Sequence, residues 1–169
     1  MQMRTDSPSR GALGSLVSLY LRLALGSAFL SAVADRFGLW GPPGGPGVAW
    51  GTFNRFTEYT ARVNPWAAPA IVLVLAWTAT VAEVLLGAAL LAGVFTRIAG
   101  LASGVLLSLF AIGMTIGTGL KSALDASVFS AAAGAFGLAL LAPDRWSVDS
   151  LRARSRARAS RRDTPIQSR

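Results

Sequence analysis

The chain lacks cysteine and histidine entirely, and charged residues make up only 14% of its 169 positions. These absences exclude disulfides, thiol redox chemistry and the usual side-chain ligands of zinc, haem and iron–sulfur clusters. We therefore expect no metal or haem site in the chain itself. An ordinary soluble domain carries about 25% charged residues, whereas 53% of this sequence is hydrophobic. The shortage of charge predicts a membrane protein.

Four long stretches are almost free of charge, and they predict an all-α protein with a bundle of four transmembrane helices. About 20 helical residues, each rising 1.5 Å, cross a hydrocarbon core of ~30 Å. No alternation with a period of two appears, which favours helices over barrel strands. The predicted membrane domain covers residues 13–142, with spans at about 13–34, 69–93, 98–120 and 123–142. Residues 1–12 are expected to be a disordered N-terminus, and residues 143–169 a basic tail.

The first apolar stretch admits a second interpretation, as a cleaved signal peptide. Arg4 and Arg10 precede it, and Ala32-Val33-Ala34 resembles a cleavage site. The stretch is longer than the apolar region of a usual signal peptide, however, and Arg22 interrupts it. A first membrane span is the better interpretation.

Basic residues are unevenly distributed along the chain. Eight of the sixteen lysines and arginines follow Pro143. Four spans put both termini on one side, which then holds eleven basic residues against four on the other. The positive-inside rule places that side in the cytoplasm. The Arg-rich tail predicts attraction to anionic lipids, and not to nucleic acid, because it has no aromatic residue after Trp146 to stack on bases.

The loop between the first two spans contains a segment with helical periodicity. Its apolar and charged side chains fall on opposite faces, and Thr52 is a candidate N-cap. The apolar face comprises Phe53, Phe56, Tyr59 and Val63, and the charged face comprises Arg55, Glu58 and Arg62. We predict a short amphipathic helix at the outer surface of the membrane. It is either a simple connector or part of a ligand site.

Two charges lie inside the predicted spans, where charged side chains are usually paired, functional or both. Arg22 is nine residues beyond the cytoplasmic end of its span, and Glu83 is ten residues before the cytoplasmic end of the second. These distances correspond to about 13 and 15 Å on antiparallel helices. The sequence therefore predicts an Arg22–Glu83 ion pair, which either fixes helix register or forms a ligand site for a proton or a quinone headgroup.

A second polar group is expected at the outer rim of the bundle. Asp35 and Arg36 close the first span, and Lys121 and Asp125 flank the turn before the last one. They form either a functional cluster or ordinary interfacial charge. Two GxxxG patterns, at 100–104 and 113–117, predict either dimer faces or close helix packing within one bundle.

Several of these motifs resemble the DoxX family of bacterial membrane proteins. Arg22-Leu-Ala-Leu-Gly26 is similar to the family's opening Arg-x-x-x-Gly. Glu83-Val-Leu-Leu-Gly87, followed by Leu91-Ala-Gly93-Val-Phe-Thr96-Arg97, resembles its second-span signature. Lys121 and Asp125 match its polar turn before the last span. After the fourth span the family often has a Gly-rich turn and Ser-Leu-Asp, where this chain has Asp144-Arg145-Trp146-Ser147-Val148-Asp149.

The resemblance implies a four-helix bundle in the bacterial cytoplasmic membrane. Some relatives are subunits of a thiosulfate:quinone oxidoreductase, and others belong to membrane-associated oxidoreductase complexes. The first functional hypothesis is therefore a redox-linked membrane subunit that binds quinone or docks an oxidoreductase, with no catalytic residue assigned in this chain. The second is a carrier of protons or small solutes. The third is a scaffold or assembly factor, and a homo-oligomer is compatible with all three.

Overall fold

The computed structural model describes residues 8–141, 146–152 and 154–155, with side chains from residue 11 onward. The described residues form helices and no strands. The three longest helices are α1 (Pro8–Arg36), α3 (Pro69–Ala92) and α4 (Thr96–Thr118), and each is long and apolar enough to cross a membrane. The chain is therefore a multi-pass membrane protein.

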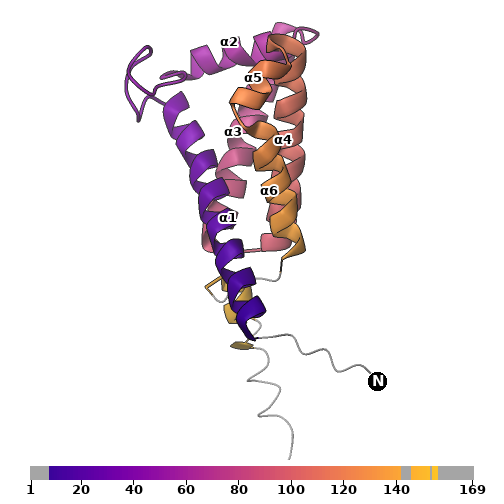
Figure 1. The fold of residues 1–169 in the computed structure, drawn as a ribbon. Coiled ribbons are helices and arrows are strands. Elements are labelled where there is room, and N and C mark those ends of the chain that lie inside the picture. Colours follow the sequence, from indigo (N-terminus) through magenta and orange to yellow (C-terminus); the bar gives the residue numbers. More distant parts are fainter. Residues whose placement is uncertain (1–7, 142–145, 153, 156–169) are drawn as a thin grey trace, which may run out of the picture.

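The helices form two antiparallel pairs with a short helix across one end (Figure 1). α1 packs against α3, and α4 packs along α6 (Val128–Leu140). The helix α2 (Phe53–Val63) lies across the end of the bundle where α1 finishes and α3 begins. We call this the α2 end, and the opposite end, which contains the turn between α3 and α4, the α3–α4 end.

The distribution of side chains fits a protein in lipid, because large apolar residues are exposed on the outside while polar residues are buried beside an apolar core. Large apolar side chains such as Leu85 and Ile98 are well exposed on the long helices. Among the residues whose side chains are described, ten polar or charged ones are buried: Ser18, Arg22, Asp35, Arg36, Thr60, Thr80, Glu83, Thr96, Ser103 and Ser147. The residues most informative about a functional site are therefore the polar and charged ones buried in the interior of the bundle.

The predicted helix in the first loop is confirmed as a helix, with the predicted cap. The backbone N–H of Arg55 donates to Thr52 Oγ1 at 3.4 Å, as expected for an N-cap. Phe56 and Thr60 on one face are buried against the bundle, whereas Arg55 and Glu58 are exposed. This opposition of faces agrees with the periodicity of the sequence.

The fourth predicted span, residues 123–142, is not a single helix. It is divided into α5 (Leu120–Asp125) and α6, which continue one another along α4 (Figure 1). The break falls at Ser127, whose φ of 55° is in the left-handed region. α6 has 13 residues and is apolar but short for a span. The sequence has no Gly or Pro at this position, which is why the break was not predicted.

The predicted ends of the chain also need correction. α1 begins at Pro8, so residues 8–12 belong to a helix, although the sequence predicted disorder through residue 12. Residues 1–7, Ala142 and most of the tail lie outside the described residues. The described part of the tail is not a free extension, because the backbone N–H of Asp149 donates to the carbonyl of Gly93 at 3.1 Å.

The GxxxG glycines are used for packing within the chain. A Cβ at Gly104 would lie 2.6 Å from the ring of Phe136 on α6, and a Cβ at Gly117 would lie 2.2 Å from the carbonyl oxygen of Arg62 on α2. Any larger residue at position 117 would therefore displace the end of α2 from α4. These contacts agree with the bundle interpretation of both patterns.

Candidate functional site

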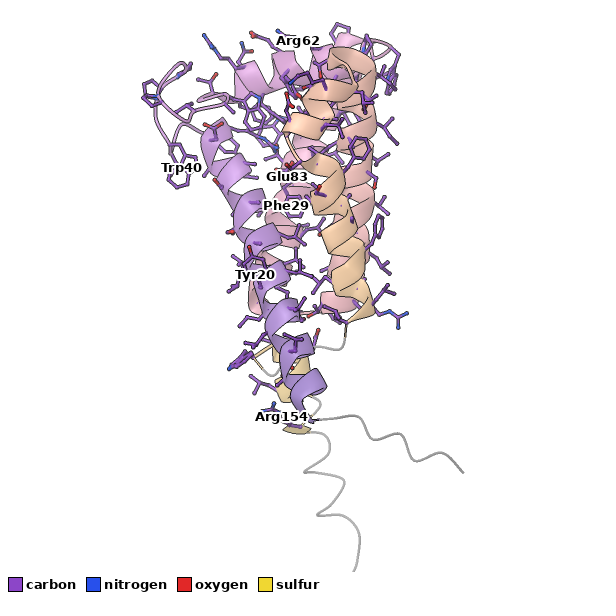
Figure 2. All side chains as sticks on the ribbon, viewed as in Figure 1. Tyr20, Phe29, Trp40, Arg62, Glu83 and Arg154 are labelled. Atoms are coloured by element: carbon purple, nitrogen blue, oxygen red, sulfur yellow. The ribbon has the colours of Figure 1, made fainter. Side chains whose placement is uncertain are left out.

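A buried ion pair between α1 and α3 is the centre of the candidate site. Nη2 of Arg36 donates to both carboxylate oxygens of Glu83, at 2.7 and 2.8 Å. Nη1 of Arg36 donates to the hydroxyl of Thr80 at 2.8 Å. Arg36 and Glu83 are 2% and 1% exposed. Figure 2 shows Glu83 in the interior of the bundle, below α2.

Aromatic side chains cover this ion pair at the α2 end. Cζ of Arg36 lies 3.6 Å from the ring centroid of Phe56 and 5.4 Å from that of Trp50. The rings of Trp50 and Phe56 meet edge to face, with centroids 5.2 Å apart. An arginine under two aromatic rings is shielded from water and held by cation–π attraction. Without that shield, water would screen the ion pair.

The aromatic cover continues to the exposed surface of the bundle. The ring of Phe53 lies beside that of Phe56, with centroids 6.0 Å apart, and 4.4 Å from the ring of Trp77 on α3. Phe37 stacks on Phe53 at 5.8 Å. Phe37 and Trp77 are both about half exposed. Aromatic rings thus form a continuous path from the surface of the bundle to Arg36.

The site contains polar atoms that lack a partner. Oδ2 of Asp35 accepts hydrogen bonds from the backbone N–H groups of Ala49 and Trp50, at 3.0 and 2.9 Å. Oδ1 of Asp35 and Nε of Arg36 are buried and have no hydrogen-bond partner. Trp50 connects the two residues, because its backbone binds Asp35 and its ring faces Arg36. A buried unpaired polar atom is costly, and such atoms mark places where a ligand or water can bind.

The predicted Arg22–Glu83 pair is wrong. Glu83 pairs with Arg36. Nε of Arg22 donates to the carbonyl of Leu90, and its Nη2 donates to the carbonyl of Leu91, both at 2.8 Å. Arg22 is as deeply buried as Arg36, at 2% exposure. Both residues have partners within the bundle, but these are not the partners that the sequence predicted.

The helix register explains this error. Gly26 and Gly87 pack face to face, with a Cβ at Gly26 lying 3.0 Å from the carbonyl of Gly87. Arg22 is one turn from this contact in one direction and Glu83 one turn in the other, so they are about 12 Å apart along the axis. Helical side chains lean toward their own N-terminus. Arg36 and Glu83 therefore lean toward each other, whereas Arg22 leans away.

The predicted outer-rim cluster is divided into two parts. Asp35 and Arg36 are buried beneath the loop and α2. Lys121 and Asp125 form an exposed i, i+4 ion pair on α5. Among the described residues no hydrogen bond or ion pair joins the two parts. Exposed pairs of this kind contribute little to stability, so Asp35 and Arg36 are the members of the group that belong to the candidate site.

At the α3–α4 end, Arg22 binds the last turn of α3. Leu90 and Leu91 precede Gly93, the C-cap of α3. Carbonyls in the last turn of a helix lack helical partners and carry partial negative charge, so a guanidinium is well placed there. A Cβ at Gly93 would lie 2.5 Å from Nη2 of Arg22. Gly93 therefore leaves the space that the guanidinium fills.

Asp149 holds the beginning of α4 at the same end. Its Oδ1 accepts from the backbone N–H of Phe95 at 3.0 Å, and its Oδ2 accepts from the N–H and hydroxyl of Thr96 at 2.8 and 3.0 Å. Burial raises the pKa of Asp149, but the hydrogen bonds from Thr96 and Phe95 lower it more, and Arg152 lowers it further. The net pKa lies below the ordinary value of 3.8. The ionised carboxylate acts as an N-cap supplied from a distant part of the chain.

Sequence reasoning did not identify Thr80, the aromatic cover over Arg36 or the cap made by Asp149. Thr80 lies one turn before Glu83, a spacing that places both on one helix face. That spacing was the available signal for Thr80. The cap made by Asp149 had none, because a cap supplied from 53 positions away leaves no local pattern. Among the described residues, no cluster of three or more acidic side chains could hold a metal ion.

Comparisons of the chain with models of protein families, with curated proteins and with solved structures found no match in any of the three.

Proposed function

We propose that the chain is a DoxX-like subunit of the bacterial cytoplasmic membrane that binds a quinone headgroup beside Arg36 and Glu83. In this role it would link membrane quinone to a redox partner protein. The observation that carries the proposal is the pair of unpartnered buried atoms, Oδ1 of Asp35 and Nε of Arg36, around Trp50. Oδ1 of Asp35 is a hydrogen-bond acceptor, and Nε of Arg36 is a hydrogen-bond donor.

A quinone has the chemistry that these two atoms require. Its carbonyl oxygens can accept from Nε of Arg36, and in the reduced form its hydroxyls can donate to Oδ1 of Asp35. Its flat ring could stack on aromatic side chains such as those of Trp50 and Phe56, which cover Arg36. The aromatic path through Phe53 and Trp77 would let a ligand dissolved in the bilayer approach from the side.

We further propose that the α3–α4 end faces the cytoplasm and that α2 lies at the outer surface of the membrane. The eleven-to-four distribution of basic residues supports this orientation. α5 and α6 would together make the fourth crossing, because α6 alone, with 13 residues, measures about 20 Å. The return of the chain to the α3–α4 end is supported by the hydrogen bonds between Asp149 and Thr96.

The proposal can be tested by titrating the purified full-length protein with a decyl-tailed benzoquinone in neutral detergent. Quinones quench tryptophan fluorescence, and Trp50 and Trp77 adjoin the site. Arg36→Lys keeps the charge beside Glu83 but removes Nε and the planar group. Loss of a hydrogen bond from a charged group, ~1.5–3 kcal/mol, should weaken binding by roughly 10- to 150-fold.

Asp35→Asn provides a second variant, because it keeps one oxygen for the N–H groups of Ala49 and Trp50 while changing the unpartnered atom. It should weaken binding of the reduced quinol more than that of the quinone. Arg62→Lys, on the exposed face of α2, is the matched control and should bind normally. Equal quenching in all three variants would refute the site.

A proton carrier is the second candidate, favoured by one observation. Glu83 is a buried carboxylate inside a span, and such groups serve proton relays. Proton entry into liposomes by a wild-type protein that does not respond to quinone would favour this function instead.

A further inference from the structure

The segment after α6 is attached to the α3–α4 turn by an unusual arrangement. Four hydrogen bonds join Asp149 to Gly93, Phe95 and Thr96, all outside the local sequence. Phe95 has a φ of 49°, a left-handed conformation that is uncommon for a bulky residue. Its N–H is nevertheless held in this conformation by Asp149. The attachment thus fixes both a distant segment and a strained turn.

This arrangement brings exposed aromatic and basic side chains to the α3–α4 end of the bundle. Phe95 and Trp146 are 62% and 55% exposed, and Arg97, Arg152 and Arg154 are exposed as well. We call Phe95, Arg97, Trp146 and Arg152 the basic collar. Figure 2 shows Arg154, two residues beyond it, at this end of the molecule near the first turns of α1.

The position of the basic collar relative to the apolar surface indicates what it meets. Ile98 directly follows Arg97 and is 65% exposed, and Leu101, one turn from Arg97, is also exposed. The lipid-facing surface of α4 therefore begins within one residue of the collar. Side chains at this level lie among lipid headgroups, where aromatic rings and basic groups are both favoured.

We propose that the basic collar is a built binding site for the headgroup of an anionic phospholipid, and that it exists only while Asp149 holds the tail against the α3–α4 turn. Guanidinium groups bind phosphate oxygens through paired hydrogen bonds. The rings of Phe95 and Trp146 enter the layer beneath the headgroups. The site is separate from Arg36 and Glu83 and does not depend on the proposed function.

A site built in this way and a simple attraction of charge predict opposite effects of one substitution. Asp149→Ala removes a negative charge beside Arg152, so attraction by charge alone would strengthen binding of anionic lipid. If Asp149 holds the collar together, the same change weakens it. Asp125→Ala is the matched control, because it removes an equal charge from the exposed pair on α5.

The experiment measures lipid-dependent shifts of the unfolding midpoint of the full chain in neutral detergent at low salt. Dioctanoyl phosphatidylglycerol is titrated against dioctanoyl phosphatidylcholine, which has equal chains and no net charge. Wild type and Asp125→Ala should prefer the glycerol lipid, and Asp149→Ala should lose about fivefold or more of this preference, comparable to one arginine at an anionic surface.

The double variant Arg97→Gln with Arg152→Gln leaves Asp149 unchanged. It therefore tests the site even if Asp149→Ala fails to fold. The preference of this double variant should fall by about 25-fold. The proposal is overturned if Asp149→Ala binds phosphatidylglycerol as well as wild type or more tightly, or if the double variant keeps the full preference.

Discussion

Two buried arginines on α1 are satisfied in different ways, and the difference separates the two ends of the bundle. Arg22 donates to the carbonyls of Leu90 and Leu91, which end α3. Arg36 donates to the side chains of Glu83 and Thr80 and lies under aromatic rings. Both are 2% exposed. Equal burial of the same residue type therefore does not indicate equal roles.

The partners explain what each arginine can do. Backbone carbonyls at a helix end are fixed by the fold, so Arg22 joins α1 to α3 without placing a titratable group beside it in α3. Glu83 is ionisable, and the group around it retains unpartnered polar atoms on Asp35 and Arg36. A ligand or a proton can therefore bind far more readily at Arg36 and Glu83 than at Arg22 and the carbonyls of α3.

The largest expected effect comes from breaking the Arg36–Glu83 pair. Glu83→Ala should lower the free energy of unfolding by ~3–5 kcal/mol, because Arg36 stays buried without its carboxylate. Arg36→Leu combined with Glu83→Leu should recover most of this loss, since no charge remains unpaired. The measurement is chemical or thermal unfolding in detergent.

Two controls sharpen this result. Lys121→Ala removes half of an exposed pair and should change stability by less than about 1 kcal/mol. Arg22→Leu combined with Glu83→Leu should show additive losses, because these residues do not pair. Recovery in that second combination would mean that the register of α1 on α3 is different from the one described.

A smaller loss is expected at the other arginine. Arg22→Met should lower the free energy of unfolding by ~1.5–3 kcal/mol through the loss of hydrogen bonds from a charged group. Arg22→Lys should recover part of the loss, because an ammonium can reach a carbonyl but lacks the fork of the guanidinium. Quinone binding, measured by fluorescence quenching, should be unchanged in both variants. A binding defect as large as that of Arg36→Lys would remove the distinction between the two ends.

The smallest effect is the pH dependence of the cap at Asp149. Its pKa is lower in the folded state, so its contribution is present at neutral pH and is lost as the pH falls below about 4. An N-cap contributes roughly 0.5–2 kcal/mol. The difference in unfolding free energy between wild type and Asp149→Asn should therefore shrink between pH 7 and pH 3. A constant difference over that range would contradict an ionised cap.

The spans and the helix in the first loop could be predicted because their signals are local. Apolar runs set the positions of α3 and α4 to within about two residues, and the periodicity from Phe53 to Val63 gave α2 with its cap at Thr52. Both depend only on residues close together in the chain. The break at Ser127 was missed because a serine in a left-handed conformation carries no distinctive sequence pattern.

The partners of the buried charges could not be predicted by counting residues from the ends of the apolar runs. That count placed Leu13 at the same depth as Gly93, which ends α3. In the structure Gly93 lies beside Arg22 instead. The contact between Gly26 and Gly87 would have given the register, and with it the Arg36–Glu83 pair. The docking of Asp149 depends on a fold that brings residues 53 positions apart together, and no spacing in the sequence contains this information.

The contact between Gly117 and the end of α2 has a consequence for the biogenesis of the protein. α2 is synthesised more than fifty residues before Gly117, yet its last turn rests against that glycine on α4. When α1 and α3 first leave the ribosome, α4 has not yet been synthesised, so the contact of Gly117 with the end of α2 cannot form. The Arg36–Glu83 pair can form early, and Phe53 of α2 can then already pack on Trp77 of α3, but the last turn of α2 meets its contact on α4 only after α4 has entered the membrane. Until then the end of α2 lacks its support on α4, which makes the newly inserted α1–α3 hairpin a vulnerable stage of assembly.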